Sequence, residues 1–255
     1  MVTDMTNLNL FCGTKTDCGE SNVLLTYEPL DSASYGAGCV VTGLADADGA
    51  PVSITVPSRS PDGRAVVAIA DGAFEGCGFL RSVSLPDGVV SVGRRSFAFC
   101  SSLSELRIGK NSRLSHIGSR AFMGCDRLAS LRLDGLAGLR AVGEKAFAYC
   151  AGLRSASLPD SLTDIPGGLF EGCRRLRRVR LPKHLIRIGC SAFYACVGLE
   201  TVRMPSDLRI IEDAAFVCCA SLRELHLPAA PCMVAGTAFA ECPLLPALPE
   251  LLGAG

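Results

Sequence analysis

The sequence predicts an α/β-type solenoid dominated by strands, in which short coils of chain stack in a right-handed pile around a parallel sheet. Two observations lead to this prediction: a Phe-x-x-Cys motif returns eight times, and the apolar residues between its copies keep a constant distance from each Cys. Successive motifs begin 23 or 25 residues apart. A unit this short cannot bury its apolar side chains alone, whereas a stack of such units forms one continuous core.

The motif predicts two buried columns, each with one residue from every coil. The first column contains Phe74, Phe97, Phe122, Phe147, Phe170, Phe193, Phe216 and Phe239. The second contains Cys77, Cys100, Cys125, Cys150, Cys173, Cys196, Cys219 and Cys242. Equivalent residues on neighbouring coils should lie about 4.8 Å apart and point the same way. We therefore interpret these cysteines as free thiols packed as small apolar groups, not as disulfides.

Within each coil, apolar residues follow the Cys at positions +3, +6 and +8, as Leu176, Val179 and Leu181 follow Cys173. This alternation is typical of a strand with one buried face. A proline such as Pro182 commonly follows and ends the strand, because it cannot donate to the ladder. A second extended piece should then run back, and the A-F-x-x-C piece should round the corner as a short helical turn.

The periodicity also suggests domain boundaries. Residues 1–22 lack the repeat and are expected to be a flexible tail. Residues 23–69 contain short apolar segments with glycine-rich links, and predict a β-rich N-terminal cap or atypical first repeat. Residues 70–242 form the repeats, and residues 243–255 an incomplete C-terminal repeat. End units must differ from the rest because they cover the open edges of the stack.

Composition limits the classes of partner. The formal net charge is zero, so no overall excess points to nucleic acid or a membrane surface. The chain is 49% hydrophobic, which is too apolar for disorder, yet no apolar run approaches the roughly 18 residues of a membrane helix. We expect no membrane insertion. The first residues lack a basic start followed by an apolar block, which favours an intracellular location.

The fourteen cysteines allow other interpretations. Such a number suits a secreted disulfide scaffold, and a metal or redox protein is a further alternative. Zinc sites, however, use paired Cys-x-x-Cys or Cys/His clusters, and the chain has no Cys-x-x-Cys. Cys190 and Cys218 fall outside the column and are interpreted as incidental. Cys12 and Cys18 could pair or bind metal, but exposed bystanders are expected. We predict no metal site and no cofactor.

No catalytic residue is expected. The three histidines, His116, His184 and His226, each lie within a repeat, and none belongs to a known catalytic signature. Carboxylates are scattered along the chain and do not gather around a predicted cleft. The sequence therefore indicates a protein that is not an enzyme.

Alternation along each strand predicts a basic strip on the solvent side of the sheet. Its members stand at positions +7 and +4 after the Cys: Arg107, Arg132, Arg180, Arg203, His226, Arg81, Arg154, Arg177 and Arg223. The strip could bind an acidic protein or an anionic glycan. Nucleic acid is disfavoured, since these columns lack aromatic platforms. The competing interpretation is that long Arg side chains cover the sheet and keep it soluble.

The block IADGAFEGCGFLRSVSLPDGVVSVGRRSF and its copies resemble the BspA-like class of leucine-rich repeats, over about Ile69 to Cys242. This resemblance implies a leucine-rich repeat solenoid and non-catalytic recognition. It also implies a role like that of bacterial or protist surface proteins that bind host proteins or other cells, and so favours a surface or secreted location. An intracellular scaffold that organises other proteins is the alternative.

Overall fold

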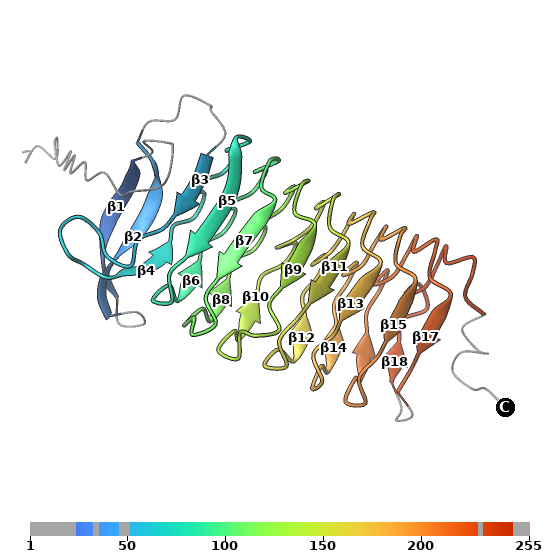
Figure 1. The fold of residues 1–255 in the computed structure, drawn as a ribbon. Coiled ribbons are helices and arrows are strands. Elements are labelled where there is room, and N and C mark those ends of the chain that lie inside the picture. Colours follow the sequence, from blue (N-terminus) through green and yellow to red (C-terminus); the bar gives the residue numbers. More distant parts are fainter. Residues whose placement is uncertain (1–23, 33–35, 46–51, 229–231, 247–255) are drawn as a thin grey trace, which may run out of the picture.

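The computed structural model describes residues 24–32, 36–45, 52–228 and 232–246. The chain forms an elongated stack of coils with its N-terminal strands at one end and its C-terminal strands at the other (Figure 1). The strand-dominated solenoid predicted from the sequence is confirmed. The predicted tail, with Cys12 and Cys18, lies outside the described residues. Within the described ranges there is no helix that could cross a membrane.

Two rows of strands run along the stack. The strand face is built from the L-x-x-V-x-L segments and contains β3 (Val52–Thr55), β5 (Leu80–Leu85), β7 (Glu105–Ile108), β9 (Ser130–Arg132), β11 (Ser155–Ser157), β13 (Arg178–Arg180), β15 (Thr201–Arg203) and β17 (Glu224–His226). The return face contains β1 (Leu25–Ser32), β2 (Gly36–Leu44), β4 (Val66–Ile69), β6 (Ser91–Val92), β8 (His116–Ile117), β10 (Ala141–Val142), β12 (Asp164–Ile165), β14 (Arg187–Ile188), β16 (Ile210–Ile211) and β18 (Met233–Val234).

Neighbouring coils pair in parallel, and equivalent residues face each other. On the strand face the ladder divides into β3-β5-β7 and β9-β11-β13-β15-β17; on the return face it divides into β1-β2-β4-β6-β8-β10 and β12-β14-β16-β18. Both gaps adjoin the coil that starts at Phe122, one of the two 25-residue coils. At the N-terminal edge, β1 pairs antiparallel with β2. This strand covers an edge that parallel coils would leave open.

The eight motif phenylalanines form one continuous stack through the core. Adjacent ring centroids lie 4.9 to 6.1 Å apart, with interplanar angles of 2° to 27°. The longest separation joins Phe147 and Phe170, where the coil length changes from 25 to 23 residues. Offset aromatic pairs of this kind contribute about 0.5–1.5 kcal/mol each beyond the area they bury. The stack therefore ties every coil to its neighbours.

The motif cysteines lie beside this stack as free thiols, and all but the half-buried Cys77 are buried. Each thiol from Cys100 onward donates a hydrogen bond to the carbonyl oxygen of the Phe in the preceding coil. These Sγ–O distances run from 3.0 to 3.3 Å. The sequence analysis treated the thiol only as a small apolar group. The hydrogen bond gives a reason for Cys at this position, since an alanine could pack there but could not donate.

The corner of each coil is not the helical turn expected from the sequence, and that prediction is wrong. The residue two after the motif Phe adopts positive φ in all eight coils, and the residue two before it does so in the first seven, for example Gly76 (74°) and Gly72 (67°) around Phe74. A left-handed residue interrupts a right-handed helix, so the chain makes successive tight turns. Its alternate N–H groups donate to the next coil, as Phe74 does to Ser96 (2.7 Å). We call this third side of the solenoid the turn face.

Candidate binding surfaces

All nine residues of the predicted basic strip are exposed on or beside the strand face: Arg81, Arg107, Arg132, Arg154, Arg177, Arg180, Arg203, Arg223 and His226. Parallel pairing holds them in rows. Ser157 on β11 faces Arg132 on one side and Arg180 on the other, and Arg203 faces His226. The strands thus fix where each Arg side chain leaves the sheet.

Carboxylates neutralise part of this strip. Arg107 binds Glu105 on its own strand, with a Nε–Oε1 distance of 2.6 Å. Arg180 lies 3.2 Å from Asp160 of the preceding coil. The backbone N–H of Lys183 also donates to Asp160, and together these contacts lower the pKa of that carboxyl. Sequence analysis placed the acids elsewhere in the coil, and could not see that stacking brings them beside the arginines.

On or next to the strand-face strands β9, β11, β13 and β15, five exposed arginines have no ion pair within the described part of the chain. We call them the arginine patch: Arg132, Arg154, Arg177, Arg178 and Arg203. Arg178 was not assigned to the strip, because its column is mixed. It lies in register between Ser155 and Thr201, at the centre of the group. The signal was visible as the run RRLRRVR, residues 174–180, which places five arginines in one coil.

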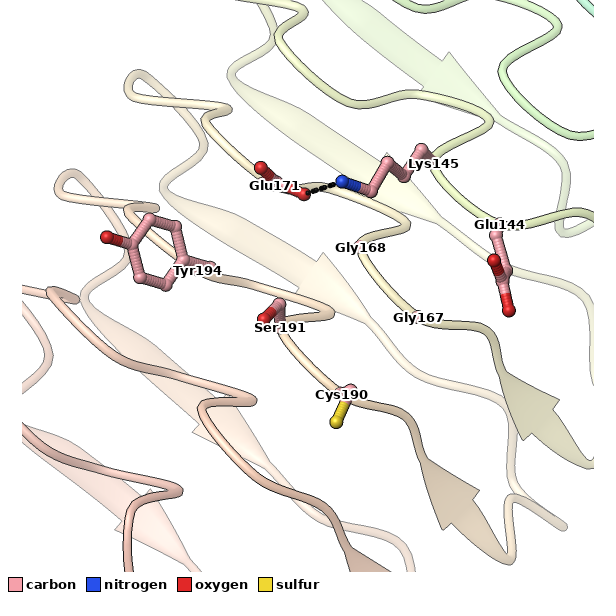
Figure 2. A pocket seen from close by; sticks show the side chains of 8 residues that line it. All are labelled: Glu144, Lys145, Gly167, Gly168, Glu171, Cys190, Ser191 and Tyr194. Carbon is pink, nitrogen blue, oxygen red and sulfur yellow. Dashed lines mark ion pairs between the residues drawn. The ribbon is translucent and has the colours of Figure 1, made fainter.

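The turn face has a cavity of about 370 Å³ (Figure 2). It opens at Gly167 and Gly168, which carry no side chains where neighbouring coils do, and we call it the glycine notch. Its lining consists of Glu144, Lys145, Gly167, Gly168, Glu171, Cys190, Ser191 and Tyr194. Lys145 Nζ lies 3.0 Å from Glu171 at its edge, and the Tyr149 hydroxyl donates to the same carboxylate. Nothing in the sequence analysis predicted this cavity.

A second cavity of about 180 Å³ adjoins the first along the stack. We call it the cationic cavity, and its lining consists of Arg94, Arg95, Ser119, Arg120, Glu144 and Lys145. Four of these six side chains are cationic and one is a carboxylate. The two cavities share Glu144 and Lys145. They therefore lie next to each other on the turn face, and we call the two together the groove.

Exposed aromatic residues also lie on the turn face, and sequence analysis missed them. Phe99 and Tyr149 are 46% and 47% exposed, and Tyr194 is 38% exposed. The first two pack over glycines of the next coil: a Cβ at Gly124 would lie 2.7 Å from the Phe99 ring. An aromatic residue followed one coil later by glycine was the signal that could have revealed Phe99 and Tyr149.

The remaining cysteines and the histidines do not form a reactive cluster in the described ranges. Cys190 is exposed, and the thiol of Cys218 lies 2.9 Å from a carboxylate oxygen of Glu241. His184 Nδ1 lies 2.9 Å from Asp207 Oδ2, while His116 and His226 are on separate coils. Among those residues, no group of three or more His, Cys, Asp or Glu side chains is suited to holding a metal ion.

Comparison with known proteins agrees with this architecture. The family described as "BspA type Leucine rich repeat region" matches residues 67–140 and 140–247, in six copies. The leucine-rich repeat protein of T. pallidum is 26% identical; the match covers 88% of this chain and 90% of that one, with a TM-score of 0.61. A leucine-rich cell surface protein of Faecalibacterium prausnitzii is 17% identical over 88% of this chain and 93% of that one, with a TM-score of 0.46. No curated protein matches. The chain belongs to the BspA-type leucine-rich repeat family.

Proposed function

We propose that this protein is a non-catalytic recognition scaffold that binds an anionic partner through the arginine patch on its strand face. The partner would be a protein with an acidic surface or an anionic glycan. Leucine-rich repeat families are generally non-enzymatic and generally bind other proteins, which supports the coarse part of this proposal. One observation supports the finer part: five exposed arginines stand on or beside adjacent strands, and none has a carboxylate partner among the described residues.

Electrostatic attraction would hold an anionic partner on this patch. Rows of cations on strands about 4.8 Å apart add their potentials, and an extended anionic surface gains from several of them at once. The same sheet neutralises Arg107, Arg180 and Arg223 with nearby carboxylates. Solubility alone would be served by such paired arginines. The concentration of unpaired ones over β9 to β15 favours a binding role.

The biological setting follows from the family as a proposal. A surface or adhesin-like role, binding host proteins or other cells, is one setting, and an intracellular scaffold is the other. Both would use the same patch. Antibody labelling of intact and permeabilised cells separates them, since a surface protein is labelled without permeabilisation.

The test uses retention on a heparin column as a polyanion probe. A triple variant, Arg132→Ser, Arg177→Ser and Arg203→Ser, should elute at clearly lower salt than the unmodified chain, because three unpaired cations are removed. The matched control replaces three exposed arginines on or next to the return face, Arg113, Arg140 and Arg209, with serine. It makes the same charge change and should elute later than the patch variant. Equal elution of the two triple variants would remove the patch from the proposal.

A further inference from the structure

We propose a second binding site on the turn face, independent of the arginine patch: the groove formed by the cationic cavity and the glycine notch binds an acidic saccharide. The sulfate or phosphate group of the sugar would occupy the cationic cavity. The sugar ring would lie in the glycine notch against Tyr194. Nothing in the repeat architecture requires this groove, because it comes from side chains that differ between coils.

Three cationic side chains stand in a row along the turn face. Arg95, Arg120 and Lys145 occupy the position two residues before the motif Phe in three consecutive coils, with φ of 52° to 57°. Other coils place small residues there: Gly72, Gly168, Ser191 and Ala214. Residues with a Cβ are strained in the left-handed region, and glycine is not. The fold accepts a small residue at this position, so it does not require three long cations in a row.

Carboxylates neutralise the two outer cations of this row but not the central one. Arg95 pairs with Glu75 at one end of the row, and Lys145 pairs with Glu171 at the other. Arg120, between them, makes no ion pair with any described residue and is exposed. The residue that follows the motif Phe could supply a carboxylate, but the three nearest coils have Ala98, Met123 and Ala148 there. The central guanidinium is therefore free to bind an anion.

The chemistry of the cavity matches an oxyanion. A planar guanidinium presents parallel N–H donors that fit two oxygens of a sulfate or phosphate, and flanking cations strengthen those charge-assisted hydrogen bonds. Arg94, Arg95 and Lys145 provide such flanks, and the Ser119 hydroxyl is a further donor. The one carboxylate in the lining, from Glu144, stands between this cavity and the glycine notch.

The glycine notch has the size and the lining to hold a sugar ring. Its cavity of about 370 Å³ is within the size range of small-ligand sites. Tyr194 offers an exposed ring face, while Ser191 and Glu144 offer hydrogen-bonding groups (Figure 2). A sugar ring has an apolar face that packs on tyrosine, and hydroxyl groups that bind such partners. Since Glu144 and Lys145 line both cavities, one ligand can reach both.

The experiment measures calorimetric binding to the full chain with four probes: a sulfated heparin-derived disaccharide, its desulfated form, inorganic sulfate and a phosphoserine peptide. Two variants copy residues found at equivalent positions in other coils, so they should fold. Arg120→Ser copies Ser191, and Tyr194→Ala copies Ala98 and Ala148. The control is Arg113→Ser, an exposed arginine away from the groove.

We expect Arg120→Ser to weaken binding of the sulfated disaccharide by about tenfold or more, because a charge-assisted contact is lost. The same variant should also weaken binding of inorganic sulfate. Tyr194→Ala should weaken binding of the disaccharide several-fold and leave binding of inorganic sulfate unchanged. Desulfation should weaken binding as Arg120→Ser does. Arg113→Ser should change neither affinity.

Three results would overturn the proposal: folded Arg120→Ser that binds the sulfated disaccharide as the unmodified chain does, Tyr194→Ala that leaves disaccharide binding unchanged, or a phosphoserine peptide that binds more tightly than the disaccharide. The triple variant of the arginine patch, Arg132→Ser, Arg177→Ser and Arg203→Ser, tests whether binding at the groove is independent of that patch. It should bind the disaccharide normally, and a loss there would assign the binding to the strand face instead.

Discussion

The buried Phe column and the left-handed column on the turn face run side by side through the same coils, yet they differ sharply in sequence. The Phe column has the same residue in all eight coils. The column two residues earlier contains Gly, Arg, Lys, Ser and Ala in the first seven coils, where φ is positive, and Thr in the last. In the core each ring is the packing partner of the next, so a change in one coil disturbs its neighbours. On the turn face only the backbone conformation repeats, and side chains are free to differ.

Removing a ring from the middle of the buried column should have the largest effect. Phe147→Ala deletes a fully buried ring stacked on both sides, and we expect a loss of about 3–5 kcal/mol in the free energy of unfolding. Phe239 is 8% exposed and stacks only on Phe216 within the described residues, so Phe239→Ala should cost less. Urea denaturation of both variants makes the comparison. Equal losses would mean that the rings do not stabilise one another as a column.

Alkaline pH should weaken the buried thiol column. Burial raises the pKa of Cys100 to about 12, and burial also raises the pKa of Cys173 and of Cys196 above the ordinary value of 9.0. Unfolded thiols ionise near pH 9 while these remain protonated in the native state. The contribution of these thiols to stability should therefore be constant below pH 9 and fall from about pH 9 to 12, by about 1.4 kcal/mol per pH unit for each such thiol.

Urea denaturation at several pH values measures this slope. Cys100→Ala removes one of the contributing thiols and should make the fall shallower. A slope that stays the same in this variant would contradict the assignment to the buried column.

The smallest predicted change is a gain in stability. Ser96 occupies a buried position where Ala121 and Ala146 stand in the next two coils, and its hydroxyl has no hydrogen-bond partner among the described residues. Ser96→Ala should stabilise the protein by about 1 kcal/mol, because an unpaired buried hydroxyl is removed without changing the packing volume much. The midpoint of urea denaturation should rise. A lower midpoint would show that the hydroxyl is satisfied in solution.

Much of the fold could be predicted because its determinants recur. The spacing of Phe and Cys, and the apolar residues at +3, +6 and +8, specify the stack and the alternation of β5 to β17. Features that residue type and spacing do not encode could not be predicted. The left-handed residues around Phe74 escaped notice because position alone does not reveal φ, and a helical turn was expected in their place. The Sγ–O contact from Cys100 to Phe74 depends on atoms of two coils.

The candidate sites were predicted less well for the same reason. The basic strip follows from strand alternation, so its residues could be named. Which of its arginines form ion pairs depends on the carboxylates that neighbouring coils bring beside them, as Asp160 of the preceding coil lies beside Arg180. The glycine notch is lined by residues of neighbouring coils on either side of Gly167 and Gly168. A single coil read alone shows only two glycines.

Mass-spectrometric mapping of alkylated thiols in the native protein tests the stacked coils most directly. Cys190 is exposed and should be modified rapidly, whereas Cys100, Cys125, Cys150, Cys173, Cys196 and Cys219 are fully buried and should be protected until denaturant is added. Cys77, which is half-buried, should react at an intermediate rate. Modification of the six buried thiols at the rate of Cys190 would show that the coils do not stack in register, and would contradict the account.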